Sequence, residues 1–307
     1  MPFVLNAEVY MLPSFAMESM LDVITHYRIE ELLLVPPILI RMVRDPIVDN
    51  YDLRFIKKFF SGAAPLSQEI IQQLQAKFPS SGLKQGYGMT ESCSCITATT
   101  LEHQDWKHAR TVGTICASTE IKIIDEEGNE LGIDQPGELL ARGPQITMGY
   151  LDNEKATKET YLQDSFMRTG DQAMISADGI VTITDRIKEM IKVNGIGVAP
   201  AELEDLLLGH KFVEDVAVLG IPHDYTGEVP KAFVVPKPGS PNQEELRKVL
   251  LDYVQENKTR HKWLAEVEFV DVIPKSASGK ILRRVLRELG SGKRHLVQDR
   301  VAQKSKL

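Results

Sequence analysis

The segment QGYGMTE, residues 85–91, combines residue types that can bind a nucleotide. Its two glycines flank Tyr87, so the backbone can turn sharply and approach a flat ligand closely. Thr90 offers a hydroxyl group to a phosphate, and Glu91 beside it offers a carboxylate oxygen of the kind that binds hard cations such as Mg²⁺. A Gly-X-Gly pair by itself more often marks an ordinary turn. The hydroxyl and the carboxylate that follow it make nucleotide chemistry the more specific interpretation.

Asp171 and Lys280, far along the chain, carry groups that the same chemistry could use. Asp171 ends the run RTGD, and a carboxylate after a glycine turn can accept hydrogen bonds from both hydroxyl groups of a ribose. Lys280 ends the run PKSASGK, whose small residues can deliver an ammonium group on a mobile loop. Taken alone, such an aspartate is usually a turn or cap residue, and such a lysine is usually a surface residue. The order of Asp171 behind residues 85–91 favours the functional interpretation for this aspartate.

The composition describes an ordinary globular protein and argues against several classes. The 307 residues are enough for two domains with real cores, and 43% of them are hydrophobic and 26% charged. A net charge of −7 and a pI near 5.6 give no electrostatic reason to expect nucleic acid as a partner. Three cysteines fit a reducing compartment better than a disulfide framework, and no second cluster accompanies Cys93 and Cys95 at the spacing of a metal site. No apolar run approaches the ~20 residues of a membrane span.

The first 90 residues predict helices packed on a parallel sheet. Apolar runs bounded by prolines are typical of strands that are covered on both faces. Strands are predicted at residues 7–11, 31–35 and 57–61, and helices at residues 17–27, 38–43 and 68–78, the last of them capped by Ser67. The small residues SGAAPL, at 61–66, follow the third strand. The carboxyl end of such a strand is where open α/β sheets receive ligands.

The middle of the chain changes to short strands and turns, and the end changes to alternating helices and strands. Residues 113–124 and 137–140 have strand patterns, with a hairpin turn at 125–129. Beyond residue 190, helices are predicted at 200–208, 242–257 and 281–289, and strands at 213–219, 231–235 and 264–270. This alternation predicts a compact α+β domain.

Several motifs resemble those of the adenylate-forming superfamily, which contains acyl-CoA and 4-coumarate–CoA ligases, firefly-type luciferases and peptide-synthetase adenylation domains. The motifs are QGYGMTE itself, SGAAPL at 61–66, RTGD at 168–171, DRIKEMIK at 185–192 and PKSASGKILRR at 274–284. A further match, around Gly137-Glu138-Leu139 and Met148-Gly149-Tyr150, implies a mostly structural role. The motifs stand in the family's order and span residues 61–284.

This resemblance implies the fold class and the domains. Residues 1–186 would be the C-terminal part of a large α/β AMP-binding domain, with a parallel sheet and a small β-rich subdomain. Residues 187–290 would be a compact α+β lid domain, and residues 291–307 a flexible tail. The family usually has a Ser/Thr/Gly-rich loop ending in Lys that cradles the β- and γ-phosphates, and this chain has none before residue 61. We therefore expect a truncated copy or a fragment of a longer ligase, with an exposed apolar sheet face.

The resemblance also implies a set of site residues. Those expected at the nucleotide are Gly62, Ala63, Ala64, Gln85, Gly86, Tyr87, Thr90, Asp171, Arg186, Lys188 and Lys192. Those expected at other ligands are Glu91 for Mg²⁺, Gly195 for coenzyme A, and Ser94, Cys95 and Ile96 for the acyl group. Lys188 would mark the pivot of the lid, Lys192 would approach a phosphate, and a side chain at Gly195 would block the pantetheine tunnel.

The implied reaction has two steps. A carboxylic acid attacks the α-phosphate of ATP to give acyl-AMP and pyrophosphate, and Lys280 bridges the attacking carboxylate and the α-phosphate as charge builds up. The lid then rotates and admits coenzyme A, whose thiol displaces AMP. Gly197 stands where many 4-coumarate ligases have Gln, and residues 94–96 stand where phenylpropanoid ligases often have Pro and a branched apolar residue. The expected acid is therefore a different one, such as a fatty acid or an acid of specialised, toxin-like metabolism.

Two other functions share these motifs, and the last three residues imply a location. A luciferase-like oxidase would emit light and require oxygen, whereas a non-catalytic remnant would bind AMP or a partner without turnover. The chain ends in Ser305-Lys306-Leu307, which predicts recognition by the peroxisomal import receptor and a peroxisomal location. A chance polar tail is the alternative, but an exact Ser-Lys-Leu tripeptide at the end of the chain favours the peroxisomal address. Neither a membrane span nor a nucleic-acid partner is expected.

Overall fold

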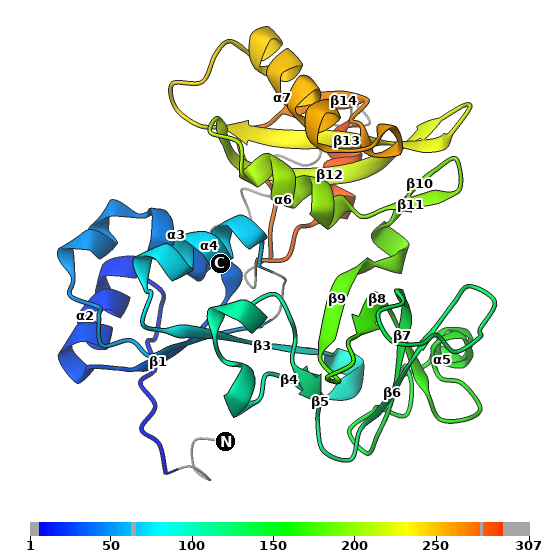
Figure 1. The fold of residues 1–307 in the computed structure, drawn as a ribbon, viewed down its shortest axis with the longest axis horizontal. Helices are drawn as coiled ribbons and strands as arrows, with labels where there is room; N and C mark the ends of the chain where they lie inside the picture. Colours follow the sequence, from blue (N-terminus) through cyan, green and yellow to red (C-terminus); the bar gives the residue numbers. More distant parts are fainter. Residues whose placement is uncertain (1–5, 63–65, 277–278, 291–307) are drawn as a thin grey trace.

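The computed structural model describes residues 6–62, 66–276 and 279–290, and these form two units joined by a short connection (Figure 1). The N-terminal unit, residues 6–186, contains two sheets. The C-terminal unit, residues 191–290, contains a third sheet with its own helices. The connection includes the 3₁₀ turn η5 (Ile187–Glu189).

The first sheet has the strand order β1-β2-β3-β4-β5. Its strands are β1 (Glu31–Leu34), β2 (Lys58–Ser61), β3 (Gly82–Met89), β4 (Ser94–Ala98) and β5 (Thr114–Ile115). The first three are parallel, whereas β4 and β5 run antiparallel to their neighbours. Its helices are α2 (Met17–Tyr27), α3 (Pro36–Arg44) and α4 (Gln68–Lys77). Ser67 caps α4 as predicted, because its hydroxyl oxygen accepts a hydrogen bond from the Ile70 amide at 3.3 Å.

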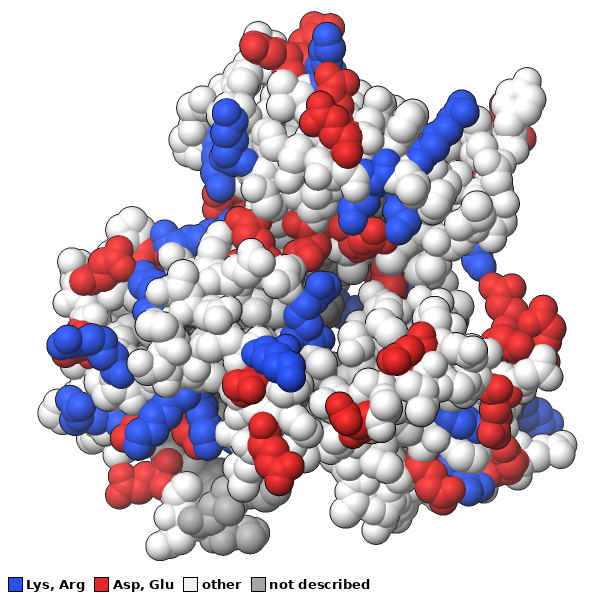
Figure 2. Space-filling model, in the orientation of Figure 1, with Lys and Arg blue, Asp and Glu red and all other residues white. Residues whose placement is uncertain are grey.

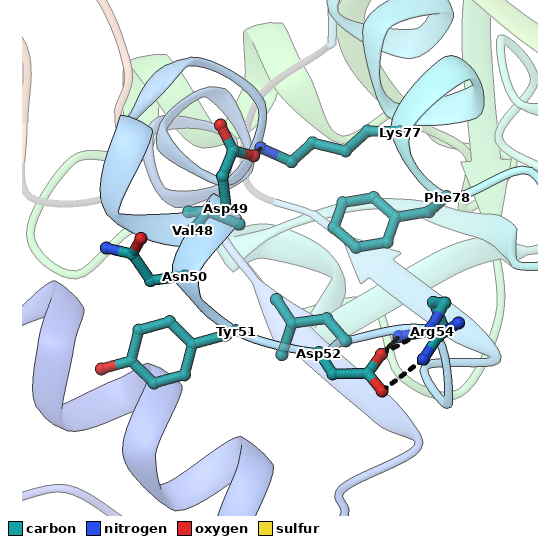
Figure 3. Close-up of a pocket in the computed structure, with 9 residues that line it drawn as sticks. Val48, Asp49, Asn50, Tyr51, Asp52, Arg54, Lys77 and Phe78 are labelled. Carbon is teal, nitrogen blue, oxygen red and sulfur yellow. Dashed lines mark hydrogen bonds and ion pairs between the residues drawn. The ribbon is translucent and has the colours of Figure 1, made fainter.

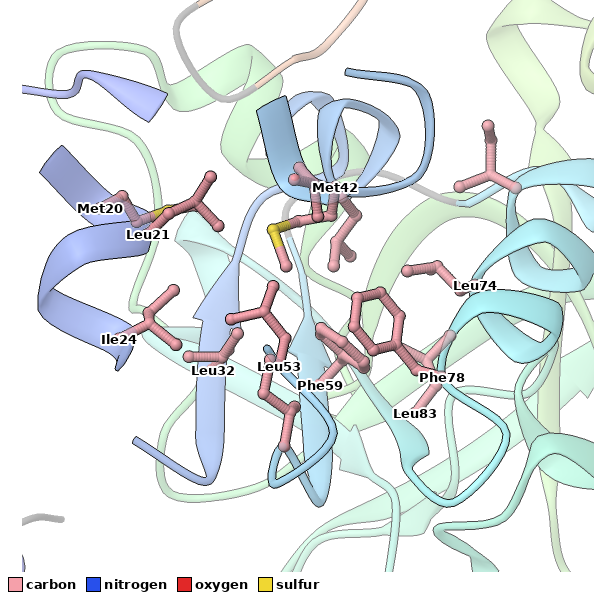
Figure 4. Close-up of a cluster of buried hydrophobic side chains, with 14 of the residues drawn as sticks. Met20, Leu21, Ile24, Leu32, Met42, Leu53, Phe59, Leu74, Phe78 and Leu83 are labelled. Carbon is pink, nitrogen blue, oxygen red and sulfur yellow. The ribbon is translucent and has the colours of Figure 1, made fainter. Parts of the chain in front are cut away.

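One face of the parallel strands forms the main core of the N-terminal unit (Figure 4). The register places Leu32, Phe59 and Leu83 in one row across β1, β2 and β3, and all three are buried. Met42 of α3 and Leu74 of α4 pack in the same cluster, so the helices cover this face. Burial of these apolar side chains is the dominant favourable contribution to folding.

The opposite face of the same strands is partly open. The next residues in the register, Leu33, Phe60 and Lys84, point away from the helices because side chains alternate along a strand. Leu33 is 76% exposed, and Phe60 is only partly buried. The prediction that these strands are covered on both faces is therefore wrong for β1. The expectation of an exposed apolar sheet face is met at Leu33.

The second sheet is antiparallel and has the order β6-β7-β8-β9. It comprises β6 (Glu120–Ile124), β7 (Gly137–Arg142), β8 (Met167–Ile175) and β9 (Val181–Arg186), with α5 (Glu154–Thr160) beside it. Its core includes Leu139, Met167 and Val181 together with Ile96 of β4. The Val181 amide also donates to the Gly113 carbonyl at 2.8 Å, so the two sheets are joined by both packing and hydrogen bonds.

The third sheet has the order β11-β10-β13-β12, with β14 paired in parallel to β13. Its elements are β10 (Ile191–Val193), β11 (Ile196–Val198), α6 (Pro200–Leu208), β12 (Val213–His223), β13 (Gly227–Pro236), α7 (Gln243–Asn257), β14 (Glu266–Phe269) and α8 (Arg283–Gly290). Val216 and Val218 of β12 pack in the core that α6 and α7 cover. Ala217 and Leu219, on the other face, pack against Leu286 of α8. Both faces of β12 are therefore buried, which explains its continuous apolar run.

Several predicted elements differ from the structure. Residues 7–11 are not a strand, because no strand in the described part of the chain pairs with them and Val9 and Met11 are exposed. The pattern at 113–124 is divided between β5 and β6 by a turn in which Ser118 has a φ of 58°. Helix α8 begins at Arg283 and not at 281, because Ile281 forms a β-bridge with Lys275.

Short 3₁₀ turns and a mixed surface complete the described chain. The remaining turns are η1 (Pro46–Asn50), η2 (Thr90–Ser92), η3 (Leu101–His103), η4 (Trp106–His108) and η6 (Arg260–Lys262). Acidic and basic side chains are interspersed on the face shown in Figure 2. Among the described residues, no helix combines the length and the apolar character that crossing a bilayer requires.

Candidate functional site

Asp171, Tyr87 and Arg186 meet at one point, although they lie far apart in the sequence. The Tyr87 hydroxyl donates a hydrogen bond to Asp171 Oδ2 at 2.6 Å, and Arg186 Nε lies 3.3 Å from Asp171 Oδ1. The antiparallel register of β8 and β9 pairs Asp171 with Arg186, and β3 brings Tyr87 from the first sheet. This cluster therefore lies where the two sheets of the N-terminal unit meet.

Opposing effects act on the Asp171 carboxyl group, and its pKa is raised above the ordinary value. Burial raises the pKa of the Asp171 carboxyl group, while the Tyr87 hydrogen bond and the charges of Arg186 and Lys280 lower it. Burial and the neighbouring carboxylate raise the pKa of Tyr87, so its hydroxyl remains a hydrogen-bond donor. A carboxylate has about four acceptor positions. Asp171 can therefore keep its contacts with Tyr87 and Arg186 and still accept hydrogen bonds from ligand hydroxyl groups.

Lys280 reaches this cluster from the C-terminal unit. Its positive charge lowers the pKa of Asp171, which places its ammonium group within electrostatic range of that carboxylate. Ser276 holds the loop, because its Oγ accepts from the Lys280 amide at 3.1 Å and its own amide donates to the Lys280 carbonyl at 2.9 Å. The Ser276 carbonyl also accepts from the Gly279 amide at 2.8 Å. These bonds fix the backbone at Lys280, whose side chain is exposed.

Glu91 lies in η2, directly after β3, and Tyr150 supports it. Glu91 Oε1 accepts a hydrogen bond from the Tyr150 hydroxyl at 2.8 Å, and the Glu91 carbonyl accepts from the Thr147 amide at 2.8 Å. The sequence assigns Tyr150 only a structural role, so this contact is a finding of the structure. No group of three or more His, Cys, Asp or Glu side chains in the described residues could hold a metal ion. One carboxylate with an oxygen free of Tyr150 fits a Mg²⁺ ion whose other ligands are phosphate oxygens and water.

Arg283 is a buried cation that sequence reasoning missed. It donates through Nε to Glu189 at 2.7 Å, and through Nη1 to Glu204 at 2.6 Å and to the Val218 carbonyl at 2.7 Å. Burial lowers the pKa of Arg283, but the two glutamates raise it overall. Glu189 follows Lys188 in the connecting turn, so Arg283 joins the Lys280 loop to the predicted pivot. The only sequence signal for this role is an arginine three residues after Lys280.

Asp185, at the end of β9, is a second buried carboxylate. It accepts hydrogen bonds from the Arg186 amide at 2.7 Å and from the Ala201 amide at 3.3 Å. Ala201 lies in the first turn of α6, so Asp185 links the N-terminal unit to a helix of the C-terminal unit. Burial raises the pKa of Asp185 to about 6.

Gln85 and Ile96, which were both expected at ligands, make other contacts in the structure. Gln85 is buried, and its side-chain amide donates to the Ala109 carbonyl, so it supports the fold in this conformation. Ile96 is fully buried in the core between the two sheets, and the expectation that it faces an acyl group is not met. Its neighbours Ser94 and Cys95 are exposed and partly exposed, respectively, and remain available to a ligand.

The remaining predicted residues lie around the cluster or beyond it. Gly62 and Gly86 both border the ring of Phe60, and Thr90 is exposed. Gly195 has a φ of 79° in the β10–β11 turn, and a Cβ there would meet open space.

The lysines of the connecting region are not gathered at Asp171. Lys188 is exposed in η5, and Lys192 Nζ lies 2.9 Å from Glu126 Oε1 on the turn after β6. Lys192 is therefore paired with a carboxylate in this conformation. Ala63, Ala64 and the terminal Ser305-Lys306-Leu307 lie outside the described residues.

A surface hollow shown in Figure 3 is separate from these residues. It is lined by η1, the segment after it and the end of α4, and none of its nine lining residues is a predicted site residue. Its charged side chains already pair with each other, since Lys77 lies 2.6 Å from Asp49 and Arg54 lies 2.8 Å from Asp52. The hollow therefore offers no free charged group for a reaction.

Two family models and several curated proteins match this chain. The family model described as AMP-binding enzyme matches residues 1–151, and the AMP-binding enzyme C-terminal domain matches residues 202–280. The 4-coumarate-CoA ligase 2 of Narcissus pseudonarcissus is 39% identical over 285 residues, which are 92% of this chain and 50% of that protein. The peroxisomal OPC-8:0-CoA ligase 1 of Arabidopsis thaliana is 40% identical over 289 residues, which are 93% of this chain and 52% of that protein.

The chain is also similar to a solved structure of an ATP-bound protein. The ATP-bound MatB from Rhodopseudomonas palustris has a TM-score of 0.84 and 27% identity, and the match covers 94% of this chain and 56% of that one. This chain thus spans about half the length of the curated relatives it matches. The two matched regions fall in the N-terminal and C-terminal units, respectively, and the cluster around Asp171 receives groups from both. The chain therefore belongs to the family of AMP-binding, adenylate-forming enzymes.

Proposed function

We propose that this chain is part of an ATP-dependent acyl- or aryl-CoA ligase, which activates a carboxylic acid as acyl-AMP and joins it to coenzyme A. The observation that supports this most directly is the cluster of Tyr87, Asp171 and Arg186, together with the positive charge of Lys280 that acts on Asp171. Asp171 would accept hydrogen bonds from the ribose hydroxyl groups. Lys280 would offset the charge that builds up as the acid attacks the α-phosphate. The curated relatives described above are CoA ligases by name.

The other site residues complete the proposal. Glu91, oriented by Tyr150, would hold Mg²⁺ together with the phosphates of ATP, and the ion would draw negative charge from them. The open space at Gly195 would receive the pantetheine arm of coenzyme A. Residues 187–290 would act as the lid, with its pivot near Lys188, and residues 1–186 would belong to the AMP-binding domain.

The proposed substrate and the proposed location rest on two short segments, residues 94–95 and residues 305–307. Ser94 and Cys95 would face the acid, and their small side chains favour a fatty or specialised-metabolite acid over 4-coumarate. Ser305-Lys306-Leu307 would bind the peroxisomal import receptor. One relative whose name describes it as peroxisomal supports this location.

The test measures the two half-reactions separately on the purified chain. Exchange of labelled pyrophosphate into ATP, with a panel of fatty and aromatic acids, reports adenylate formation. Thioester formation from supplied acyl-AMP and coenzyme A reports the second step. The Lys280→Ala variant is expected to lower the exchange at least ~100-fold, because a preorganised charge at the transition state is lost, and to change the second step less. Lys248→Ala, an exposed lysine on α7, is the matched control. Equal loss in both half-reactions would contradict the assigned role.

A binding function without turnover is the second candidate, because Lys192, which was expected to approach a phosphate, is paired with Glu126 in this structure. It predicts that AMP binds the chain measurably by calorimetry while no acid in the panel supports pyrophosphate exchange. Exchange above the background of the Lys280→Ala variant would exclude this candidate.

A further inference from the structure

The C-terminal unit touches the N-terminal unit along helices α3 and α4, in addition to the Lys280 loop (Figure 1). Asp205 of α6 accepts a hydrogen bond through Oδ1 from the amide of Gln68, the first residue of α4, at 2.7 Å. Arg44, the last residue of α3, donates through Nη1 to the carbonyl of Glu214 at 2.9 Å. Two separate segments of the C-terminal unit are therefore bonded to two neighbouring helix ends.

A third contact lies at the other end of α3. A Cβ on Gly279 would overlap the ring of Pro37, in the first turn of α3, so the Lys280 loop rests directly on this helix. Helix α3 thus meets the C-terminal unit at both its ends, through Pro37 and through Arg44. Contacts at separate points fix the orientation of a rigid unit, whereas one contact would leave it free to turn.

Asp205 accepts a hydrogen bond from a backbone amide that has no hydrogen-bond partner within helix α4. The first four amide groups of a helix have no partner within the helix, and the positive end of the helix dipole lies there. Ser67 accepts from the Ile70 amide, and Asp205 supplies the partner for the Gln68 amide from the other unit. The bond is strengthened by the charge of the carboxylate.

The contact between the C-terminal unit and helices α3 and α4 also has features that weaken it. Three of the six buried side-chain polar atoms that lack a hydrogen-bond partner in the described residues are Arg44 Nη2, Gln68 Oε1 and Glu69 Oε2. Arg44 Nη2 and Glu69 Oε1 are 3.9 Å apart, beyond hydrogen-bond distance, and burial raises the pKa of Glu69. Buried polar atoms without partners reduce the net stability of a contact. This combination fits an interface that forms and opens reversibly.

We propose that Asp205 and Arg44 form a docking latch that holds the C-terminal unit in the orientation in which Lys280 faces Asp171. Asp205 touches no reacting atom, so it is a positioning residue. Its consequence for catalysis rests on the proposed ligase function. When the latch is closed, the acid can be activated, and when it opens, the C-terminal unit can turn about residues 187–190 for the second half-reaction.

The orientation can be measured without turnover. Spin labels at Lys155 and Glu256, two exposed positions in the two units, are introduced into the full chain with its three cysteines replaced by serine. Distances between the labels are expected to form one main population. The Asp205→Ala variant is expected to add a second population, with the docked-to-undocked ratio lowered by roughly tenfold, which is typical of losing one charge-assisted hydrogen bond. Asp205→Asn, which keeps an acceptor oxygen, is expected to restore much of the docked population.

The control is Asp252→Asn, an exposed carboxylate on α7 that should leave the distances unchanged. Unchanged distances in both Asp205→Ala and Arg44→Ala would overturn the latch. In the half-reaction assays, Asp205→Ala is expected to lower adenylate formation several-fold while thioester formation from supplied acyl-AMP does not fall. A parallel fall in both steps would replace the latch with a general structural role. An inactive parent chain would count against the ligase proposal alone, because the distance measurement still decides on the latch.

Discussion

Asp171 and Asp185 show how the same residue type is set to different tasks by its neighbours. Both are buried, and burial raises the pKa of each. Asp171 also has a hydroxyl donor and two cations in its surroundings, which oppose the effect of burial while its pKa stays raised. Asp185 receives mainly backbone amides, from Arg186 and Ala201, and these hold the junction of the two units. Asp185 therefore joins the two units, whereas Asp171 is the carboxylate that we propose for the ligand.

The Asp185→Asn variant should change how stability depends on pH. The pKa of Asp185 is about 6 in the folded protein, compared with about 3.9 in an unfolded chain. Because the folded state binds this proton more tightly, its contribution to stability is complete below about pH 4 and is lost as the pH rises toward 6. Urea unfolding at pH 4 and pH 7 should show that the wild type loses roughly 1–3 kcal/mol more than the variant across this range. Asp178→Asn, at an exposed turn, is the control and should follow the wild type. Parallel curves for wild type and Asp185→Asn would contradict this prediction.

At the scale of single elements, the loop that carries Lys280 depends on one glycine. Gly279 has a φ of 86°, a conformation that side chains disfavour, and a Cβ there would overlap Pro37. The Gly279→Ala variant should therefore displace the loop from α3 and lower pyrophosphate exchange by about tenfold or more, since small displacements of a catalytic group are costly.

A double variant, Gly279→Ala with Pro37→Ala, separates the effect of overlap with Pro37 from the effect of backbone strain at residue 279. Pro37→Ala removes the ring that the new Cβ would meet, so the double variant should recover part of the exchange that Gly279→Ala loses. Gly239→Ala, at a φ of 82° with open space around it, is the control for backbone strain alone. Exchange that is equally low with and without Pro37 would show that strain, and not the contact with α3, is responsible.

Elements with local signals could be predicted from the sequence, whereas contacts between distant segments could not. Helix α4 and its Ser67 cap follow from neighbouring residues, and the structure confirms them. The strand expected at residues 7–11 is wrong, because a strand needs a partner that the pattern itself does not supply. The bond between Asp205 and Gln68 could not be predicted, because the two residues are separated by 137 positions in the sequence and the local pattern does not show which surfaces meet.

The same distinction between local signals and long-range contacts applies to the candidate site. The types of Tyr87, Asp171 and Lys280 could be interpreted from their motifs, but their convergence depends on the register of β8 with β9 and on the docking of the C-terminal unit. Ile96 was expected at a ligand because of its place after Glu91, yet the junction of two sheets buries it. Alternation along β4 explains the difference, since Ile96 points to the opposite face from Cys95.

At the scale of the whole molecule, the described chain has a closed core on one side of the first sheet and an open face on the other. β1 stands at the edge of this sheet, and Leu33 on its open face is 76% exposed beside Phe60. An edge strand with unpaired backbone groups and an exposed apolar side chain is a site of self-association. The sheet that contributes Tyr87 to the cluster around Asp171 therefore also has an exposed apolar edge that can bind another copy.

Replacing Leu33 with lysine should reduce self-association without weakening the fold. A charge on an edge strand opposes pairing between sheets, and Leu33 lies outside the buried core, so unfolding free energy should change by no more than about 0.5 kcal/mol. Sedimentation velocity over a range of concentrations should show a smaller associated fraction for Leu33→Lys than for the wild type. Leu101→Lys, which places the same charge at an exposed leucine in η3, is the matched control. An equal decrease of the associated fraction in both variants would mean that net charge, and not the open face of β1, governs association.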